Sequence, residues 1–161
     1  MSGQIELRPW HELDDGNAWP WIDAAWYYLA DDFAPRNQQD FFAMKRALGA
    51  NLIGVWRDDD LGGMLIHERV SPTIAVAHCV FSKRFSDGHT TLEAIELGKE
   101  LARASGIHVI WCLIPEDHRA MRALIKRAGA RFEGILYERF LRKGTWTNFA
   151  SYSIIAPYDD N

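Results

Sequence analysis

The sequence predicts an α/β protein in which helices flank a central mixed β-sheet. Three observations indicate this class. Alternating apolar residues mark short strands near both ends of the chain, short turns join most neighbouring strands, and the middle of the chain runs strand, turn, helix, strand. A strand–helix–strand unit requires a crossover, so we expect strands 73–81 and 107–114 to be parallel. The strands joined by short turns should be antiparallel, which makes the sheet mixed.

The N-terminal third should contain one strand and two helices. Residues 4–8 alternate apolar and polar side chains, as a short strand does, and Pro9 ends that strand. Pro20 favours a helix start, because a proline at the first helical position gives up no hydrogen bond. Asn37 is the expected N-cap of the second helix, and Gly49 follows its end. The apolar side of this helix should carry Phe41, Met44 and Leu48.

The rest of the chain should supply the remaining strands and two further helices. Gly106 and Gly129 are placed to end the helices, and Lys143 and Gly144 to make the last turn. The expected strands are 51–57, 61–70, 73–81, 107–114, 131–143 and 145–155, and the expected helices are about 90–105 and 116–129. The first of these helices should bury Leu92, Ile95, Leu97 and Leu101. The order is therefore β-α-α-β-β-β-α-β-α-β-β, and we expect one domain, residues 1–161.

Composition and charge narrow the classes of function. The 161 residues are 48% apolar and 25% charged, an ordinary balance for a protein with one core. The net charge of −4 argues against a nucleic-acid partner and against an anionic membrane surface. No apolar run has the length of a membrane span, and the N-terminus lacks the apolar segment of a signal peptide. We therefore expect a cytoplasmic protein without a membrane partner.

The two cysteines, Cys79 and Cys112, lie inside apolar strands. This placement is typical of reduced, buried thiols in an intracellular protein. No group of His and Cys residues has the spacing of metal ligands, so no metal is expected.

The stretch SKRFSDGHTTLEA, residues 82–94, joins an apolar strand to a helix through a polar turn that contains a glycine. The first amides of a helix have no partner inside it, and such a turn often binds a phosphate. Free amides over residues 87–91 would cradle a pyrophosphate, and Gly88 would allow a close approach. The simpler alternative is a capped helix start that binds no ligand.

Two stretches and the element order resemble a known family. With Val80 at the strand end, the turn Phe85-Ser86-Asp87-Gly88-His89-Thr90 falls on the pattern Gln/Arg-x-x-Gly-x-Gly/Ala. The second stretch, HRAMRALIKRAGA at residues 118–130, falls on Asn-x-x-Ala-x-x-Leu-Tyr followed by Gly-Phe. Over about residues 4–155 the chain resembles the GNAT superfamily of N-acyltransferases, and it looks most similar to small phage and bacterial members.

The resemblance implies a GNAT-like fold and acetyl-CoA as co-substrate. The strand backbone at Cys79, Val80 and Phe81 would hold the pantetheine arm and the thioester. The turn would hold the pyrophosphate through Phe85, Ser86, Asp87, Gly88, His89, Thr90 and Thr91. His118 would bond the pantetheine arm. Arg122 would meet the phosphates on the adenosine side, although a solvated basic helix face explains this residue equally well.

Four residues depart from the family pattern. Phe85 stands where Gln or Arg is usual, and Thr90 where Gly or Ala is usual. His118 replaces an Asn, and Ile125 replaces the Tyr that often protonates the leaving thiolate. A thiol leaves readily, so loss of this acid slows the reaction without preventing it. These departures weaken the site that the resemblance implies.

His78 is the candidate general base, because it lies on the strand just before the expected thioester. A histidine packed into the core is the alternative, and His67, Glu68 or a chain of waters are rivals for the role. Tyr137 is a candidate for contact with the acyl group, as is Tyr152, although strand aromatics more often cover a core. Trp10, Trp19, Trp21 and Trp26 would either line an acceptor pocket or pack the core.

The sequence therefore predicts an acetyl-CoA-dependent N-acetyltransferase that transfers acetyl to a primary amine, on a small molecule or a peptide, by direct attack. The alternative is a GNAT-fold structural or assembly protein, for example of a phage head, with a weakened or inactive CoA site. Either protein could form a homodimer through the last strands, and a phage-encoded chain would work in the host cytoplasm or bind a phage structural partner.

Overall fold

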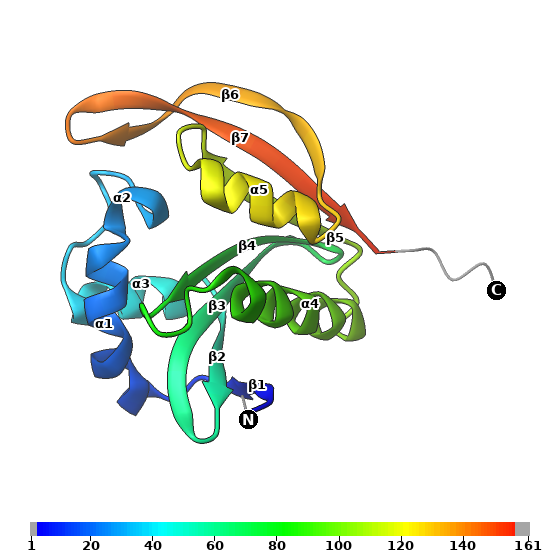
Figure 1. Cartoon of the computed structure of the whole chain (residues 1–161). Helices are drawn as coiled ribbons and strands as arrows, with labels where there is room; N and C mark the ends of the chain where they lie inside the picture. The colour runs from blue at the N-terminus through cyan, green and yellow to red at the C-terminus, as the bar shows by residue number, and fades with distance from the viewer. Residues whose placement is uncertain (1–2, 157–161) are drawn as a thin grey trace.

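A seven-stranded sheet forms the centre of the computed structural model, which describes residues 3–156 (Figure 1). The strand order is β1-β2-β3-β4-β5-β7-β6. The β4–β5 pair is parallel and every other pair is antiparallel, which confirms the predicted mixed sheet. The strands are β1 Ile5–Pro9, β2 Asn51–Arg57, β3 Asp60–Ser71, β4 Ile74–Phe81, β5 Val109–Pro115, β6 Arg131–Arg142 and β7 Thr145–Ile155.

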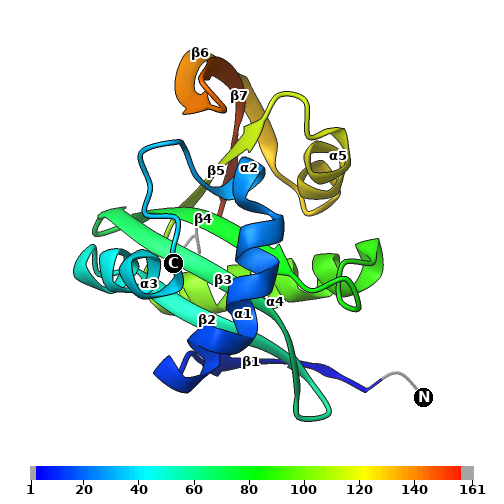
Figure 2. The same ribbon diagram turned by 90° about the vertical axis from the view of Figure 1, so that its left-hand side faces the viewer.

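Helices cover both faces of the sheet (Figure 2). On one face, α1 Asp15–Ala24, α2 Trp26–Leu29 and α3 Gln38–Ala47 pack on β3 and β4, after a short 3-10 turn at Glu12–Asp14. On the other face, α4 Gly88–Ala104 and α5 Arg119–Arg127 enclose the second core with β5 and β7. The element order agrees with the prediction, except that the first helix is divided in two.

The first helix begins earlier than Pro20 predicts. It starts at Asp15, and Pro20 lies inside it, on the exposed side. The carbonyl that Pro20 leaves without a helical donor belongs to Gly16, which is also exposed, so water can satisfy it. The chain leaves helical geometry at Ala25, where α1 ends and α2 begins.

The second helix has its predicted cap but a different buried side. The Asn37 side chain accepts a hydrogen bond from the Asp40 amide at 2.9 Å, which confirms the N-cap. Phe41 and Phe42 are buried, whereas Leu48 lies past the helix end and is 63% exposed. The expectation for Leu48 was wrong because the last turn of α3 points away from the sheet.

Helix α4 packs closely on the sheet through small residues. Its buried positions are Thr90, Thr91, Ala94, Ile95, Gly98 and Ala102. A Cβ atom on Gly98 would lie 2.8 Å from Leu65 Cδ1, so the absence of a side chain there allows the contact with β3. Leu101 is 37% exposed, so its expected burial was wrong.

The last hairpin crosses above α5 and reaches α2 at its tip (Figure 1). Lys143 and Gly144 make the tight turn, as predicted, and both have positive φ, 48° and 71°. The segment after α2 holds this tip, because the Asp32 amide donates to the Leu141 carbonyl at 2.8 Å. The Asp32 carboxylate also accepts from the amides of Lys143 and Gly144, at 2.9 and 2.8 Å.

Candidate functional site

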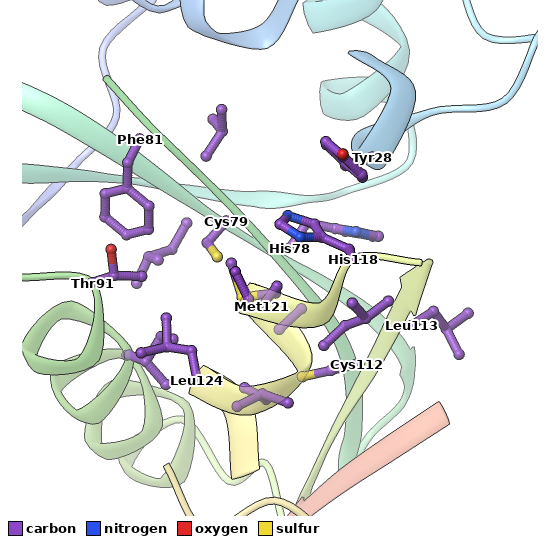
Figure 3. Close-up of a pocket in the computed structure, with 18 of the residues that line it drawn as sticks. Tyr28, His78, Cys79, Phe81, Thr91, Cys112, Leu113, His118, Met121 and Leu124 are labelled. Carbon is purple, nitrogen blue, oxygen red and sulfur yellow. The ribbon is translucent and has the colours of Figure 1, made fainter. Parts of the chain in front are cut away.

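The two parallel strands separate, and a cavity of about 490 Å³ lies at the separation (Figure 3). Pairing between β4 and β5 covers only three positions and ends at Val76 and Trp111. Beyond Val76, the β4 backbone pairs with β3 on one side only. Its other edge faces the opening, where it can pair with an extended ligand that carries amide groups. The backbone at Cys79, Val80 and Phe81, where the resemblance places the pantetheine arm, therefore has a free edge.

The cavity reaches both faces of the sheet. On the side of α4 and α5 its walls include Cys79, Thr91, Gly98, Cys112, Met121 and Leu124. On the side of α1 and α2 they include Ala25, Tyr28, Leu29 and His118. In Figure 3, Phe81 and Thr91 lie at one end and Tyr28 and His118 at the other. Two substrates could therefore approach each other from opposite sides of the sheet.

The turn before α4 is capped by its own carboxylate. Oδ1 of Asp87 accepts hydrogen bonds from the amides of His89 and Thr90, at 3.1 and 2.8 Å. A hydrogen bond with the Thr90 side chain is the main cause that lowers the pKa of Asp87, and these amide bonds lower it further. The Thr91 amide donates to the Asp87 carbonyl at 3.1 Å. The expectation of free amides through residue 91 was therefore wrong for the last three.

Two amides of this turn remain for a ligand. Within residues 3–156, the amides of Asp87 and Gly88 have no hydrogen-bond acceptor. A Cβ atom on Gly88 would meet nothing within 4 Å, so the space beside this amide is open. The side chains of Ser86 and His89 are exposed beside it. The anion site that the turn can offer is thus smaller than the sequence predicts.

Three side chains of the turn fix its shape, and two of them, Phe85 and Thr90, lie outside the cavity lining. Phe85 is 2% exposed and lies under the Arg57 guanidinium, 5.0 Å from the ring centre. Thr90 is also 2% exposed and accepts a hydrogen bond from Arg57. The Thr91 hydroxyl donates to the Phe85 carbonyl at 3.3 Å, although Thr91 also lines the cavity. Phe85, which stands where the family pattern has Gln or Arg, is therefore a buried anchor of the turn beneath Arg57.

His78 lines the cavity on β4, opposite Ile66 of β3 in the strand register. Burial, and secondly the positive charge of Lys45, lower the pKa of His78 to about 4. The imidazole is thus neutral at physiological pH, and burial makes it a weaker base than a free histidine. Glu68 forms an ion pair with Lys45, and its negative charge acts on the His78 pKa in the opposite direction.

His67 and Cys79 line the same cavity. Burial lowers the pKa of His67. Burial raises the pKa of the Cys79 thiol to about 12, so almost no reactive thiolate forms at neutral pH. Cys79 therefore contributes backbone and volume to the site, as does Val80 beside it.

His118 lies at the start of α5 and lines the cavity beside Tyr28. The two rings are 4.0 Å apart between centroids, in a tilted stack. Burial is the main cause that lowers the pKa of His118, so the ring is a neutral hydrogen-bonding group. His78 and His118 therefore both line this cavity, one from β4 and one from the start of α5 (Figure 3).

Six of the predicted site residues do not line the cavity: Phe85, Asp87, His89 and Thr90 of the turn, and also Tyr137 and Arg122. Tyr137 is 72% exposed, in an irregular part of β6 between Leu136 and Phe140. Arg122 is occupied within the protein, because its Nε donates to the Tyr152 hydroxyl at 3.1 Å and its Nη1 to the Glu116 carbonyl at 2.8 Å. Arg122 therefore ties α5 to β7.

The sequence reasoning missed Tyr28, Lys99 and Arg127 as wall residues. Tyr28 is 41% exposed, so its ring is available to a ligand in the cavity. The tryptophans of this region pack in the core instead. Trp19 and Trp26 both pack against Phe41, with ring centroids 6.0 and 5.7 Å apart.

The described part of the chain shows neither a metal-binding cluster nor a helix that could span a membrane. Among residues 3–156 no three His, Cys, Asp or Glu side chains gather in a way that could hold a metal ion. Within the same residues, no helix combines the length and the apolar character needed to cross a bilayer.

Comparison with known proteins gives matches in structure and none in sequence. No protein-family model and no curated protein matches the sequence. RimJ from Mycobacterium smegmatis, solved in complex with CoA-disulfide, superposes with a TM-score of 0.80 at 18% identity, over 96% of this chain and 83% of that one. Spermidine N-acetyltransferase from Vibrio cholerae, solved with CoA and spermine, superposes with a TM-score of 0.81 at 13% identity, over 94% of this chain and 95% of that one.

A third solved structure extends the same likeness. An acetyltransferase from Salmonella typhimurium that modifies the N-terminal serine of a 50S ribosomal subunit protein gives a TM-score of 0.80 at 17% identity, over 95% of both chains. These neighbours are GNAT N-acetyltransferases. The chain therefore has the GNAT fold, as the resemblance implied.

Proposed function

We propose that the protein is an acetyl-CoA-dependent N-acetyltransferase that transfers acetyl to a primary amine by direct attack. The observation that carries this proposal is the opening between β4 and β5, whose cavity of about 490 Å³ is reached from both faces of the sheet. Structural neighbours solved with CoA support the same co-substrate. Such a reaction would take place in the cytoplasm.

The cavity and the turn would hold different parts of acetyl-CoA. The pantetheine arm would lie in the opening, where its amides can pair with the free edge of β4 at residues 77–81. The thioester carbonyl would lie near Cys79 and Val80, where one backbone amide on the free edge of β4 could bond the developing oxyanion. The pyrophosphate would meet the free amides of Asp87 and Gly88. His118 can donate one hydrogen bond to the pantetheine arm.

The reaction would begin with a neutral amine that attacks the thioester carbon from the side of α1 and α2. A C–N bond forms, the carbonyl electrons move to oxygen, and the C–S bond then breaks as the carbonyl is restored. The amine proton passes to His78, directly or through a water. The side chain of Ile125 cannot donate a proton, so CoA would leave as the thiolate and be protonated afterwards by solvent.

The acceptor would bind at the end of the cavity formed by Ala25, Tyr28 and Leu29. A small molecule or the terminus of a peptide would fit this approach. Homodimers could form along β6, the edge strand of the sheet, where Phe132 and Tyr137 are 46% and 72% exposed.

One observation favours the alternative of a structural or assembly protein with a weakened CoA site, for example in a phage particle. The Asp87 carboxylate already occupies two of the amides that would bind phosphate. Its negative charge would also repel a pyrophosphate. This alternative predicts little or no binding of acetyl-CoA.

The test is an acetyl-transfer assay that measures release of the CoA thiol with a panel of small amines and short peptides. We expect turnover with at least one class of amine. We expect His78→Asn to lower kcat while the KM for acetyl-CoA stays unchanged, because His78 acts on the amine. His11→Asn, at an exposed position outside the cavity lining, is the matched histidine control. Absence of turnover together with absence of acetyl-CoA binding would contradict the proposal.

A further inference from the structure

Arg142, at the end of β6, is a buried cation without a carboxylate partner. It is 3% exposed, and within residues 3–156 its Nε and Nη1 atoms have no hydrogen-bond partner. Its guanidinium lies between two aromatic rings, 4.9 Å from the centre of Tyr27 and 4.3 Å from that of Phe149. A buried guanidinium is normally paired, because removal from water is costly for an unpaired charge.

The nearby carboxylates are bound to other groups. Asp32 accepts hydrogen bonds from the amides of Lys143 and Gly144, at 2.9 and 2.8 Å. Asp117 accepts from the Tyr27 hydroxyl at 3.2 Å. Neither forms an ion pair with Arg142 among the described residues. The aromatic rings hold the guanidinium in place and the Tyr27 side chain also hydrogen-bonds to it, but Nε and Nη1 remain as donors for an anion.

Arg142 lies behind the acceptor end of the cavity. Tyr27, which covers the guanidinium, contacts Tyr28 with ring centroids 5.2 Å apart. Tyr28 in turn stacks on His118, and both of these residues line the cavity. The charge of Arg142 also contributes to lowering the pKa of His118. The exposed Lys143 is next in the chain, and its Nζ lies 5.5 Å from the Tyr27 ring centre.

We propose that Arg142 binds a carboxylate of the acceptor, so that the acceptor is an amino acid or a similar amine that carries a carboxylate. The proposal rests on the acetyltransferase function proposed above. A guanidinium fork matches a carboxylate in a two-bond geometry, and a rotation of Tyr27 would open Arg142 to the cavity. Lys143 adds positive charge on the path of approach. An amine held by its carboxylate would have its nitrogen directed back toward His78 and the thioester.

The test measures binding and turnover separately. L-phenylalanine, L-leucine and L-glutamine are each compared with the corresponding amide, which keeps the amine and the side chain but removes the negative charge. Binding is measured by isothermal titration in the presence of saturating CoA, with the wild type, Arg142→Gln and Arg142→Lys. Thermal melting checks that each variant is folded, and kcat/KM is measured for the same six compounds.

We expect at least one acid to bind about 30-fold or more tightly than its amide, since a buried charge pair is lost in the amide. Arg142→Gln should remove this preference, and Arg142→Lys should restore part of it. The preference is a ratio within one protein, so a loss of stability in a variant does not imitate it. Equal binding of acids and amides by the wild type, or an unchanged preference in Arg142→Gln, would overturn the proposal.

The two proposals fail in distinguishable ways. If amides are acetylated as well as acids, the protein is an acetyltransferase and Arg142 is only a structural cation. If acids bind through Arg142 but no compound is acetylated, the carboxylate site is supported and the catalytic function is not. Binding of none of the acids overturns the proposal for Arg142, whatever the turnover of other amines.

Discussion

The opening between β4 and β5 and the turn before α4 would hold two ends of one cofactor, but they differ in how much of their backbone is free to hydrogen-bond a ligand. At the opening, the backbone of β4 has an unpaired edge beyond Val76. At the turn, Asp87 has already bonded the amides of His89 and Thr90. The comparison indicates that the thioester arm, rather than the pyrophosphate, should supply most of the binding energy in this protein.

The largest loss of acetyl-CoA affinity is expected from a variant that fills the opening between β4 and β5. Cys79→Phe would place a ring in the space proposed for the pantetheine arm, which Cys79 lines. We expect acetyl-CoA affinity to fall by about 100-fold or more, because steric exclusion removes the whole set of strand contacts. Isothermal titration measures this loss. Cys79→Ser, which keeps the volume, should bind acetyl-CoA as the wild type does, and similar affinities in all three proteins would place the arm elsewhere.

The next effect concerns the stability of the turn. Phe85 is 2% exposed, and a Cβ atom on Gly62 would lie 2.1 Å from its ring, so the ring fits a space that a glycine leaves. We expect Phe85→Ala to lower the free energy of unfolding by about 3–5 kcal/mol. Urea denaturation measures it. A loss below about 1 kcal/mol would mean that Phe85 is not a core residue.

At the turn, Gly88→Glu should weaken acetyl-CoA binding by about 10- to 30-fold, less than Cys79→Phe. The added carboxylate would repel the pyrophosphate, and the open space beside Gly88 means that the fold should tolerate it. S-acetylpantetheine lacks the pyrophosphate and should bind both proteins equally. Gly88→Ala is the matched control with no added charge. A variant that binds both ligands as the wild type does would show that the turn holds no phosphate.

His78 should make stability depend on pH at the opening. Burial lowers its pKa from 6.5 to about 4, so the folded protein resists protonation more than the unfolded chain does. This contribution is complete above pH 6.5 and is lost as the pH falls toward about 4. We expect the free energy of unfolding to decline over this window, and the decline to be smaller in His78→Asn. Parallel pH profiles for the two proteins would show that His78 titrates normally.

The smallest expected effect is an increase in acetyl-CoA affinity. Asp87→Asn keeps an N-cap oxygen but removes the negative charge beside the proposed pyrophosphate. We expect acetyl-CoA to bind about threefold more tightly, with a gain that shrinks at high salt. Asp87→Ala removes the cap together with the charge, so it should also lose about 1 kcal/mol of stability, and comparison with Asp87→Asn separates the two effects. No gain for Asp87→Asn at low salt would mean that the carboxylate does not oppose the phosphate.

The sequence predicted the fold well because strand alternation, short turns and glycine stops are local signals. The parallel β4–β5 pair followed from the crossover alone, and the Asn37 cap and the turn at Lys143 from their residue types. The start of the first helix was missed, since Pro20 lies inside α1 on an exposed side where its missing amide costs little.

The site was less predictable because it depends on contacts between distant parts of the chain. Nothing near Phe85 in sequence shows that Arg57 and Gly62 make a place for its ring. The role of Asp87 as a cap was open to sequence reasoning, since Asp is a preferred N-cap residue, but the turn was interpreted as a phosphate site first. The position of Arg142 between Tyr27 and Phe149 depends on a hairpin that folds back over α2.

The most direct measurement is an isothermal titration of the wild-type protein with acetyl-CoA and, in parallel, with S-acetylpantetheine. We predict saturable binding of acetyl-CoA in the micromolar range, and binding of S-acetylpantetheine that is weaker by no more than about 30-fold, because the opening carries most of the affinity. Absence of acetyl-CoA binding at millimolar concentration would contradict the account and would direct the search toward a protein partner.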